Sequence, residues 1–182
     1  VICQTNAAGA DVGSLGLQSF DAGGFTLVVV TAFTTSRRIH YLALGGDSIT
    51  NAKVGHFTAA TATGSQTVTG VGFQPDFIML LNRRSTSDVD SGATGYCMSI
   101  GAAASSTQMA TSSVASVDAS ASTVTTSYSI DIECTELQPQ GGGSPVRRAT
   151  LTNFNADGFV LNWLEVDGTS AHRLPYLAIK GG

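Results

Sequence analysis

The chain has 182 residues, of which only 12% are charged, and its formal net charge is −4. This composition offers no basic surface for nucleic acid or for a membrane, and no apolar run reaches membrane-spanning length. Few charges keep copies of such a chain apart, which favours close packing against other subunits.

The cysteines and the first residues set further bounds. Cys3, Cys97 and Cys134 are odd in number and widely spaced. We expect three reduced, buried thiols, with one bridge plus one free thiol as the open alternative. Val1 begins a segment without the features of a signal peptide. We expect the natural N-terminus to lie upstream of Val1. One explanation is a processed or truncated chain, and the alternative is that the first strands complete a neighbouring subunit.

The N-terminal part of the chain predicts a β-hairpin. Residues 25–30 form an apolar run, which is typical of a strand buried on both faces. Asp21 and Gly24 frame a turn before this strand, because Asp bonds its own backbone and Gly closes such turns. The tip that follows the strand has no Asp-Gly or Asn-Gly pair, so Phe33 there is a candidate contact residue.

The middle of the chain predicts more strands. Residues 55–69 alternate as two exposed strands, and Pro75 precedes a strongly apolar strand over residues 77–81. A polar loop and a short strand over residues 96–100 follow. Residues 102–127 suit a long surface loop or irregular strands. A helix within them is disfavoured by their many Ser and Thr residues.

The last part of the chain predicts a strand, a loop and a second hairpin. Residues 127–133 alternate as a strand, and residues 138–145 form a Gly-rich flexible loop. Residues 159–166 predict a strand, and Asp167-Gly168 offers a tight turn after it. Residues 172–179 are then expected to return as its partner strand.

The end of the chain repeats its beginning. Residues 15–46 align with residues 149–182, first at an offset of 134 and then, after one inserted residue, at 135. The first offset places Leu17, Phe20, Gly24, Phe25 and Leu27 on Leu151, Phe154, Gly158, Phe159 and Leu161. Cys3 matches Cys134 only at an offset of 131. A period this long indicates duplicated domains rather than a solenoid.

We therefore expect residues 1–46 to be the C-terminal part of a first repeat unit and residues 47–182 to be a complete unit. Many short strands with Gly-rich turns, and no long helical pattern, predict an all-β fold. The expected architecture is an antiparallel β-sandwich, jelly-roll-like, with a partial repeat of the same unit at the N-terminus.

Residue types that carry chemistry are sparse. His40, His56 and His172 show no metal-ligand spacing, and we interpret them as structural surface histidines. The chain has no G-x-S-x-G motif for a nucleophile. Asp88 and Asp90 could begin a calcium site, but solvated loop acids are the favoured interpretation. The sequence predicts no catalytic, cofactor-binding or metal-binding residue.

An acidic segment and an arginine pair flank the Gly-rich loop. Glu133 and Glu136 come before it, and Arg147 and Arg148 follow it. The simplest account of these charges is a cross-strand ion pair or a subunit contact. Aromatic residues such as Trp163 are expected in the core rather than in a sugar-binding platform.

Paired arginines are candidate polar anchors at subunit interfaces, with ordinary solubilising charges as the alternative. Together with the hairpin-tip aromatic, the candidate interface residues are Phe33, Arg37, Arg38, Arg83, Arg84, Arg147 and Arg148.

Two runs of sequence resemble a known family. Residues 68–81, VTGVGFQPDFIMLL, resemble a GFxPD motif followed by an apolar strand in many tailed-phage structural proteins. Residues 157–182 contain DGFVLNW and then YLAIKGG, and they resemble the C-terminal DGFTLNW and YLALGG pattern of the same phage and prophage proteins. The resemblance covers about residues 47–182. It implies a β-rich structural module used in symmetric copies, without cofactor or catalytic residues.

The resemblance leads us to expect a non-enzymatic virion structural protein of a tailed phage, capsid-decorating or tail-associated. Its partners would be other copies of itself in a symmetric homo-oligomer and other virion proteins, assembled in the host cytoplasm. No nucleic acid and no membrane is expected as a partner.

The alternative is a receptor- or glycan-binding module of a tail fibre, which exposed Trp163, Tyr176 or Phe33 side chains would favour. A hydrolase of host polysaccharide would need two carboxylates roughly 5–9.5 Å apart, and the sequence offers no spacing that indicates them.

Overall fold

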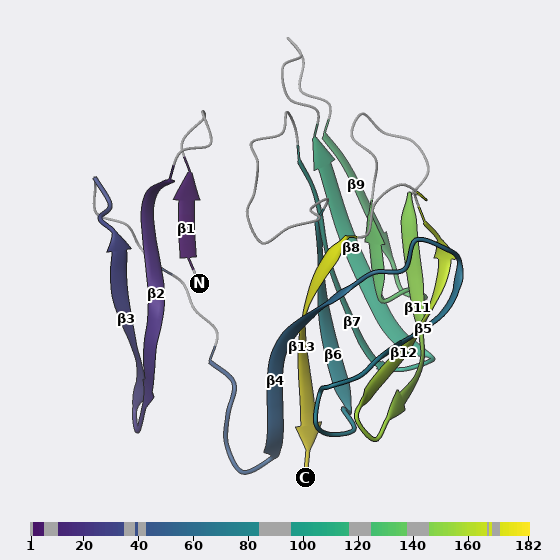
Figure 1. Cartoon of the computed structure of the whole chain (residues 1–182), viewed down its shortest axis with the longest axis horizontal. Coiled ribbons are helices and arrows are strands. Elements are labelled where there is room, and N and C mark those ends of the chain that lie inside the picture. Colours follow the sequence, from purple (N-terminus) through teal and green to yellow (C-terminus); the bar gives the residue numbers. More distant parts are fainter. Residues whose placement is uncertain are drawn as a thin grey trace. The chain divides into compact units, whose positions relative to one another are not determined.

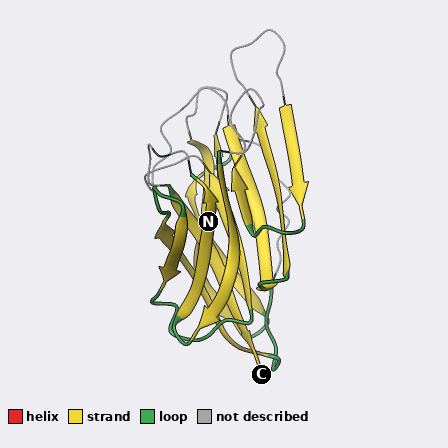
Figure 2. Cartoon of the chain, turned by 90° about the vertical axis from the view of Figure 1, so that its right-hand side faces the viewer, coloured by secondary structure: helices red, strands yellow, loops and turns green. Residues whose placement is uncertain are grey.

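The computed structural model describes residues 2–5, 11–34, 39, 43–83, 96–116, 125–137, 146–166, 168 and 172–182. Within these residues every regular element is a β-strand, and neighbouring strands pair antiparallel (Figure 1, Figure 2). The chain divides into two compact units, Val1–Leu44 and Gly45–Gly182.

The first unit is a single three-stranded sheet, which we call the N-terminal sheet. Its strands are β1 (Ile2–Thr5), β2 (Asp11–Asp21) and β3 (Gly24–Thr31), in the order β1-β2-β3. The predicted turn between β2 and β3 is confirmed. Its Asp21 carboxylate accepts hydrogen bonds from the hydroxyls of Ser19 and Thr26, at 3.0 and 2.7 Å.

The prediction that residues 25–30 are buried on both faces is wrong. The side chains of Val28, Val29 and Val30 are all exposed. The reason is that the described part of this unit holds one sheet, so an apolar strand within it has no second layer to cover it.

The second unit contains two sheets. The large sheet has the order β4-β13-β6-β7-β8-β9, and the small sheet has the order β10-β11-β12-β5 (Figure 1). The strands are β4 (Ile49–Thr58), β5 (Gly64–Val68), β6 (Phe77–Arg83), β7 (Tyr96–Ser105), β8 (Gln108–Ser116), β9 (Thr125–Ile130), β10 (Thr135–Leu137), β11 (Arg147–Asn155), β12 (Gly158–Glu165) and β13 (Arg173–Gly181). The all-β antiparallel sandwich is therefore confirmed, whereas its jelly-roll connectivity is not.

The expected hairpin after β12 is wrong. Gly168 has the positive φ of 69° that suits a turn, but β13 does not pair with β12. Both edges of β12 are already occupied by β11 and β5, so the chain crosses to the large sheet and inserts β13 between β4 and β6.

The described part of the uncertain stretch, residues 102–116 and 125–127, belongs to the large sheet. It contains the end of β7, the whole of β8 and the start of β9, so the strand alternative is the closer one and these described residues form no helix. The expected strand after Pro75 is confirmed as β6.

The core of the second unit lies between its two sheets. Alternate residues of β13 are fully or almost fully buried, as the period of a half-buried strand requires. The core side chains include Ile78, Leu80, Leu174, Tyr176 and Ala178 from the large sheet and Ala149, Leu151, Phe159, Leu161 and Trp163 from the small sheet. Phe159 meets Phe57 and Tyr176 edge to face, with ring centroids 5.8 and 5.6 Å apart. The prediction that Trp163 and Tyr176 belong to the core is confirmed.

The hairpins β2–β3 and β11–β12 have the same register. Each cross-strand pair of the first hairpin recurs 134 residues later in the second, for example Leu17 with Leu27 as Leu151 with Leu161. Both hairpins also carry their register shifts at corresponding places, after Ser14 and Leu17 and after Arg148 and Leu151.

Strands β1 and β10 extend this correspondence. Ile2 opposes Leu15 in the N-terminal sheet, and Thr135 opposes Ala149 in the small sheet. Cys3 then corresponds to Glu136, so the sequence match of Cys3 to Cys134 is wrong.

Candidate functional site

Polar side chains collect where β10 lies across the strands of the large sheet. This short strand pairs with β11 and also contacts β6, β7 and β8. Buried polar residues of the second unit include Asn82, Ser99 and Ser113 from the large sheet and Glu133, Thr135, Glu136 and Arg147 from the opposite side. We call these residues, together with Arg148, the buried polar cluster.

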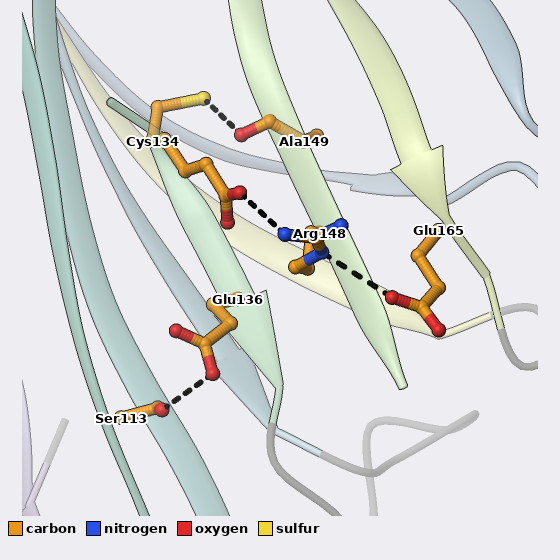
Figure 3. Close-up of polar contacts among 7 residues, drawn as sticks. Ser113, Cys134, Glu136, Arg148, Ala149 and Glu165 are labelled. Atoms are coloured by element: carbon orange, nitrogen blue, oxygen red, sulfur yellow. Dashed lines mark hydrogen bonds and ion pairs between the residues drawn. The ribbon is translucent and has the colours of Figure 1, made fainter. Parts of the chain in front are cut away.

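Arg148 joins two carboxylates in this cluster (Figure 3). Its Nη1 donates to Oε1 of Glu133 at 3.0 Å, and its Nε lies 3.3 Å from Oε2 of Glu165 on the neighbouring strand. The predicted ion pair across the Gly-rich loop is therefore confirmed for Arg148 and Glu133. Burial raises the pKa of the Glu133 carboxyl above its usual value, and the adjacent Arg148 guanidinium opposes that rise only in part.

Two further hydrogen bonds tie β10 to the large sheet. The Ser113 hydroxyl donates to Oε1 of Glu136 at 3.2 Å, as Figure 3 shows, and Nδ2 of Asn82 donates to the Thr135 hydroxyl at 3.3 Å. Three other buried polar atoms, Oε2 of Glu133, Oδ1 of Asn82 and Oγ of Ser99, have no hydrogen bond within the described residues. The cluster joins the sheets through polar contacts as well as through apolar packing.

Arg147 is fully buried and makes its contacts inside the second unit. Its Nη1 donates to the backbone oxygen of Ala60 at 2.8 Å, and its guanidinium carbon lies 5.3 Å from the centre of the Trp163 ring. Nε1 of Trp163 in turn donates to Oε1 of Gln66 at 2.7 Å. Arg147 therefore helps to hold β5, β11 and β12 together.

Cys134 stands beside the cluster with its thiol buried. The prediction of a reduced, buried thiol is confirmed for this residue, and its Sγ donates to the backbone oxygen of Ala149 at 3.4 Å (Figure 3). Burial raises the pKa of this thiol to about 12. The side chains of Cys3 and Cys97 lie outside the described residues.

Asp157 organises the loop before β6. Its carboxylate accepts hydrogen bonds from the backbone N–H groups of Gly70 and Gly72, at 2.9 and 2.7 Å. These two bonds lower the pKa of the Asp157 carboxyl below its usual value. Gly70 and Gly72 both have positive φ, 82° and 89°, which glycine adopts without strain.

The structure separates the other candidate interface residues. Phe33 is half-buried in the first unit, where its ring covers Gly13 so closely that no Cβ would fit there. Arg83 ends β6, and its side chain lies outside the described residues, as do Arg37, Arg38 and Arg84 entirely. Of the three candidates whose side chains the structure describes, Phe33 belongs to the first unit, and Arg147 and Arg148 belong to β11 of the second.

The interpretation of His172 as a surface residue is wrong. Its side chain is buried, and its backbone oxygen accepts a hydrogen bond from the N–H of Ala59 at 2.8 Å. His56 is exposed, as expected, and contacts Arg173, while His40 lies outside the described residues.

Two kinds of site are not found in the part of the chain that the structure describes. No three His, Cys, Asp or Glu side chains there are grouped in a way that could hold a metal ion. Nor is any helix present there that is long and apolar enough to cross a membrane.

The cluster can therefore fasten two sheets together, and its charged groups interact chiefly with each other and with the backbone. Sequence reasoning found the Arg148 pair from charge complementarity. It missed Asn82, Ser99 and Ser113, because single polar residues within strands give no signal until the strands are paired. Comparison of the chain with family models, with curated proteins and with solved structures found no match.

Proposed function

We propose that the protein is a non-enzymatic structural component of a tailed-phage virion, capsid-decorating or tail-associated, that acts through repeated subunit contacts. The observation that carries this proposal is the uncovered N-terminal sheet. Its hairpin matches β11–β12 in register. Leu15, the counterpart of Ala149, is buried, but other side chains that correspond to core residues are far more exposed than their counterparts. Val29, for example, is 58% exposed where its counterpart Trp163 is 1% exposed.

An uncovered apolar sheet suits a protein that is completed by its neighbours. A sheet that is hydrophobic on one face buries that face against another layer in a stable fold, and the N-terminal sheet has no second layer among the described residues of its unit. In the second unit, the corresponding face packs against the large sheet. Symmetric assembly could supply such a layer many times, so that modest contacts add to a strong whole.

The buried polar cluster supports the non-enzymatic part of the proposal. Its arginines and carboxylates bond to each other, to Ser113 and to the Ala60 backbone oxygen. Groups used in this way stabilise the sandwich and are not presented to a substrate.

The glycan-binding alternative depended on exposed aromatic side chains. Trp163 and Tyr176 are buried in the core, and Phe33 lies against Gly13, so none of these three supplies an open aromatic platform.

The first test is the mass of the purified chain by light scattering, followed by negative-stain electron microscopy. We expect a symmetric oligomer, and we expect gold-labelled antibodies against it to decorate tailed particles from its source. A chain that stays monomeric at every concentration and labels no particle would contradict the proposal. Glycan-array binding by that monomer would instead support the tail-fibre alternative.

A further inference from the structure

The outward side of the large sheet carries an uninterrupted apolar row. Strand pairing places Val54 opposite Leu177, Leu177 opposite Met79, and Met79 opposite Ala102. Ala102 in turn lies opposite Ala110 on β8. Residues paired directly across antiparallel strands share one face of the sheet, so these five apolar residues form a single row across five strands.

A second row runs beside the first. Leu81 lies opposite Ile100, and Ile100 lies opposite Ser112. Met98, two residues from Ile100 on β7, is on the same face because side chains alternate along a strand. The intervening residues Ile78 and Leu80 are fully buried in the core, so both rows point away from the small sheet.

We call this surface the outer apolar face and define it by Val54, Leu177, Met79, Leu81, Met98 and Ile100. Four of its side chains, those of Val54, Leu81, Met98 and Ile100, are exposed. Within the described strands, the charged residues paired into this face lie toward its ends, with Arg173 opposite Thr58 and Arg83 opposite Met98. His56 lies opposite Pro175 and contacts Arg173 at the same end. A contiguous apolar patch of this kind marks an interaction site in soluble proteins.

We propose that the outer apolar face is an interface between two copies of this chain. The choice of a second copy rests on the proposed structural function and on two properties of the face. Its centre has no charge that a charged partner could complement, and none that would repel the same face of another copy. Ala102, Ala110 and Ser112 keep its middle flat, which allows two sheets to pack face to face.

The size of the face suits a modest contact that is repeated in an assembly. Five strands about 4.8 Å apart, each contributing about five residues at ~3.3 Å per residue, cover roughly 400 Å². Two copies would then bury on the order of 800 Å², which is typical of a weak interface and gains strength only when symmetry repeats it. A two-fold axis makes such a contact self-complementary, because the same patch serves both copies.

The test compares two substitutions in the full-length chain, Ile100→Asp on the outer apolar face and Leu164→Asp on the small sheet. These side chains are matched in exposure, 48% and 43%, so either aspartate is tolerated by the folded unit. Ile100→Asp would bury two unpaired carboxylates at the two-fold contact, and we expect the dimer dissociation constant to rise at least ~100-fold. Leu164→Asp should leave it unchanged, and both variants should keep the wild-type circular dichroism spectrum.

The methionines give a second readout in the unmodified chain. Met98 is 44% exposed on the outer apolar face, whereas Met109 is 8% exposed in the core. Peroxide should oxidise Met98 in dilute solution and spare it at concentrations where the dimer forms, and Met109 should stay protected in both. Mass spectrometry of peptides measures each site.

The outcomes separate this interface from the proposed function. Oligomers that survive Ile100→Asp, or that leave Met98 equally open to peroxide, would overturn the interface while leaving a structural role intact. Protection of Met98 at every dilution would mean that another part of the same chain covers the face, and would also overturn the interface. A wild-type chain that is monomeric throughout would overturn the interface, and it would contradict the proposed function as well if it labels no tailed particle.

Discussion

At the scale of single residues, Gly101 shows how closely Cys134, the residue before β10, approaches the large sheet. A Cβ at this position would stand 1.9 Å from the backbone oxygen of Cys134. Gly101→Ala should therefore push the Cys134 segment away and lower the free energy of unfolding by about 3 kcal/mol, the upper part of the usual range for overpacking.

Chemical denaturation measures this loss, and Gly181→Ala is the matched control. The nearest atom that a Cβ at Gly181 would meet is 3.6 Å away, an ordinary contact distance. Equal stability of the two variants would contradict the close approach of Cys134 to β7.

Cys134 should be inert in the native protein. Its thiol is buried and its pKa is raised to about 12, so almost no thiolate exists near neutral pH. In a chain carrying Cys3→Ser and Cys97→Ser, an aromatic disulfide reagent should label Cys134 only after denaturant is added. Fast labelling of the folded chain, followed by absorbance, would contradict the described burial.

Glu133 should make stability fall as pH rises. Burial raises the pKa of its carboxyl above 4.5, so the folded state holds the Glu133 proton more tightly than the unfolded state does. The stabilising contribution of Glu133 is fully present below the pKa that its carboxyl has in the unfolded state. It is lost as pH rises through the pKa of the folded state. The free energy of unfolding of the wild type, measured relative to that of Glu133→Gln, should therefore decrease as pH rises over that range. A difference that rises with pH would show that the pairing with Arg148 outweighs burial.

At the scale of elements, Asp157 fastens the β11–β12 turn to the loop before β6, and its pH dependence has the opposite sign. Hydrogen bonds from the backbone N–H groups of Gly70 and Gly72 lower the pKa of the Asp157 carboxyl below 3.8. The stabilising contribution of this carboxylate is therefore present above 3.8 and is lost as pH falls through the pKa of the folded state. Relative to Asp157→Asn, the wild type should lose its stability advantage on acidification. Thermal unfolding between neutral pH and acid measures it, with Asp131→Asn as an exposed control.

Local sequence signals predicted individual strands and turns better than they predicted which strands pair with each other. Pro75 ahead of β6 and the Asp-Ala-Gly-Gly turn before β3 act within a few residues, and both expectations are confirmed. Asp167-Gly168 favoured a hairpin on the same local grounds. It failed because the partner of β13 is decided by which strand edges are already occupied, and that information is spread over the whole unit.

At the scale of the whole molecule, the pattern of many short strands and Gly-rich turns, without a long helical pattern, indicated an all-β antiparallel sandwich, and the structure confirms it. An apolar residue such as Val28 indicates that a strand can be buried, but it does not indicate whether a second layer covers the strand. The expected burial of β3 was wrong for this reason. The candidate site was foreseen only where complementary charge gave a signal, at Arg148 and Glu133. The buried position of His172 and the contacts of Asn82 depend on strand pairing and had no signal in the linear sequence.

The position of β13 also constrains the order in which the protein can be made. This strand is last in the chain, yet it is the only described link between β4 and β6 in the large sheet. During synthesis, β6–β9 can form a meander from local contacts, while β4 must wait, with one edge unsatisfied, for residues more than a hundred positions away. The large sheet therefore closes only after β13 has been synthesised and has left the ribosome, and the nascent unit presents an open strand edge until that moment.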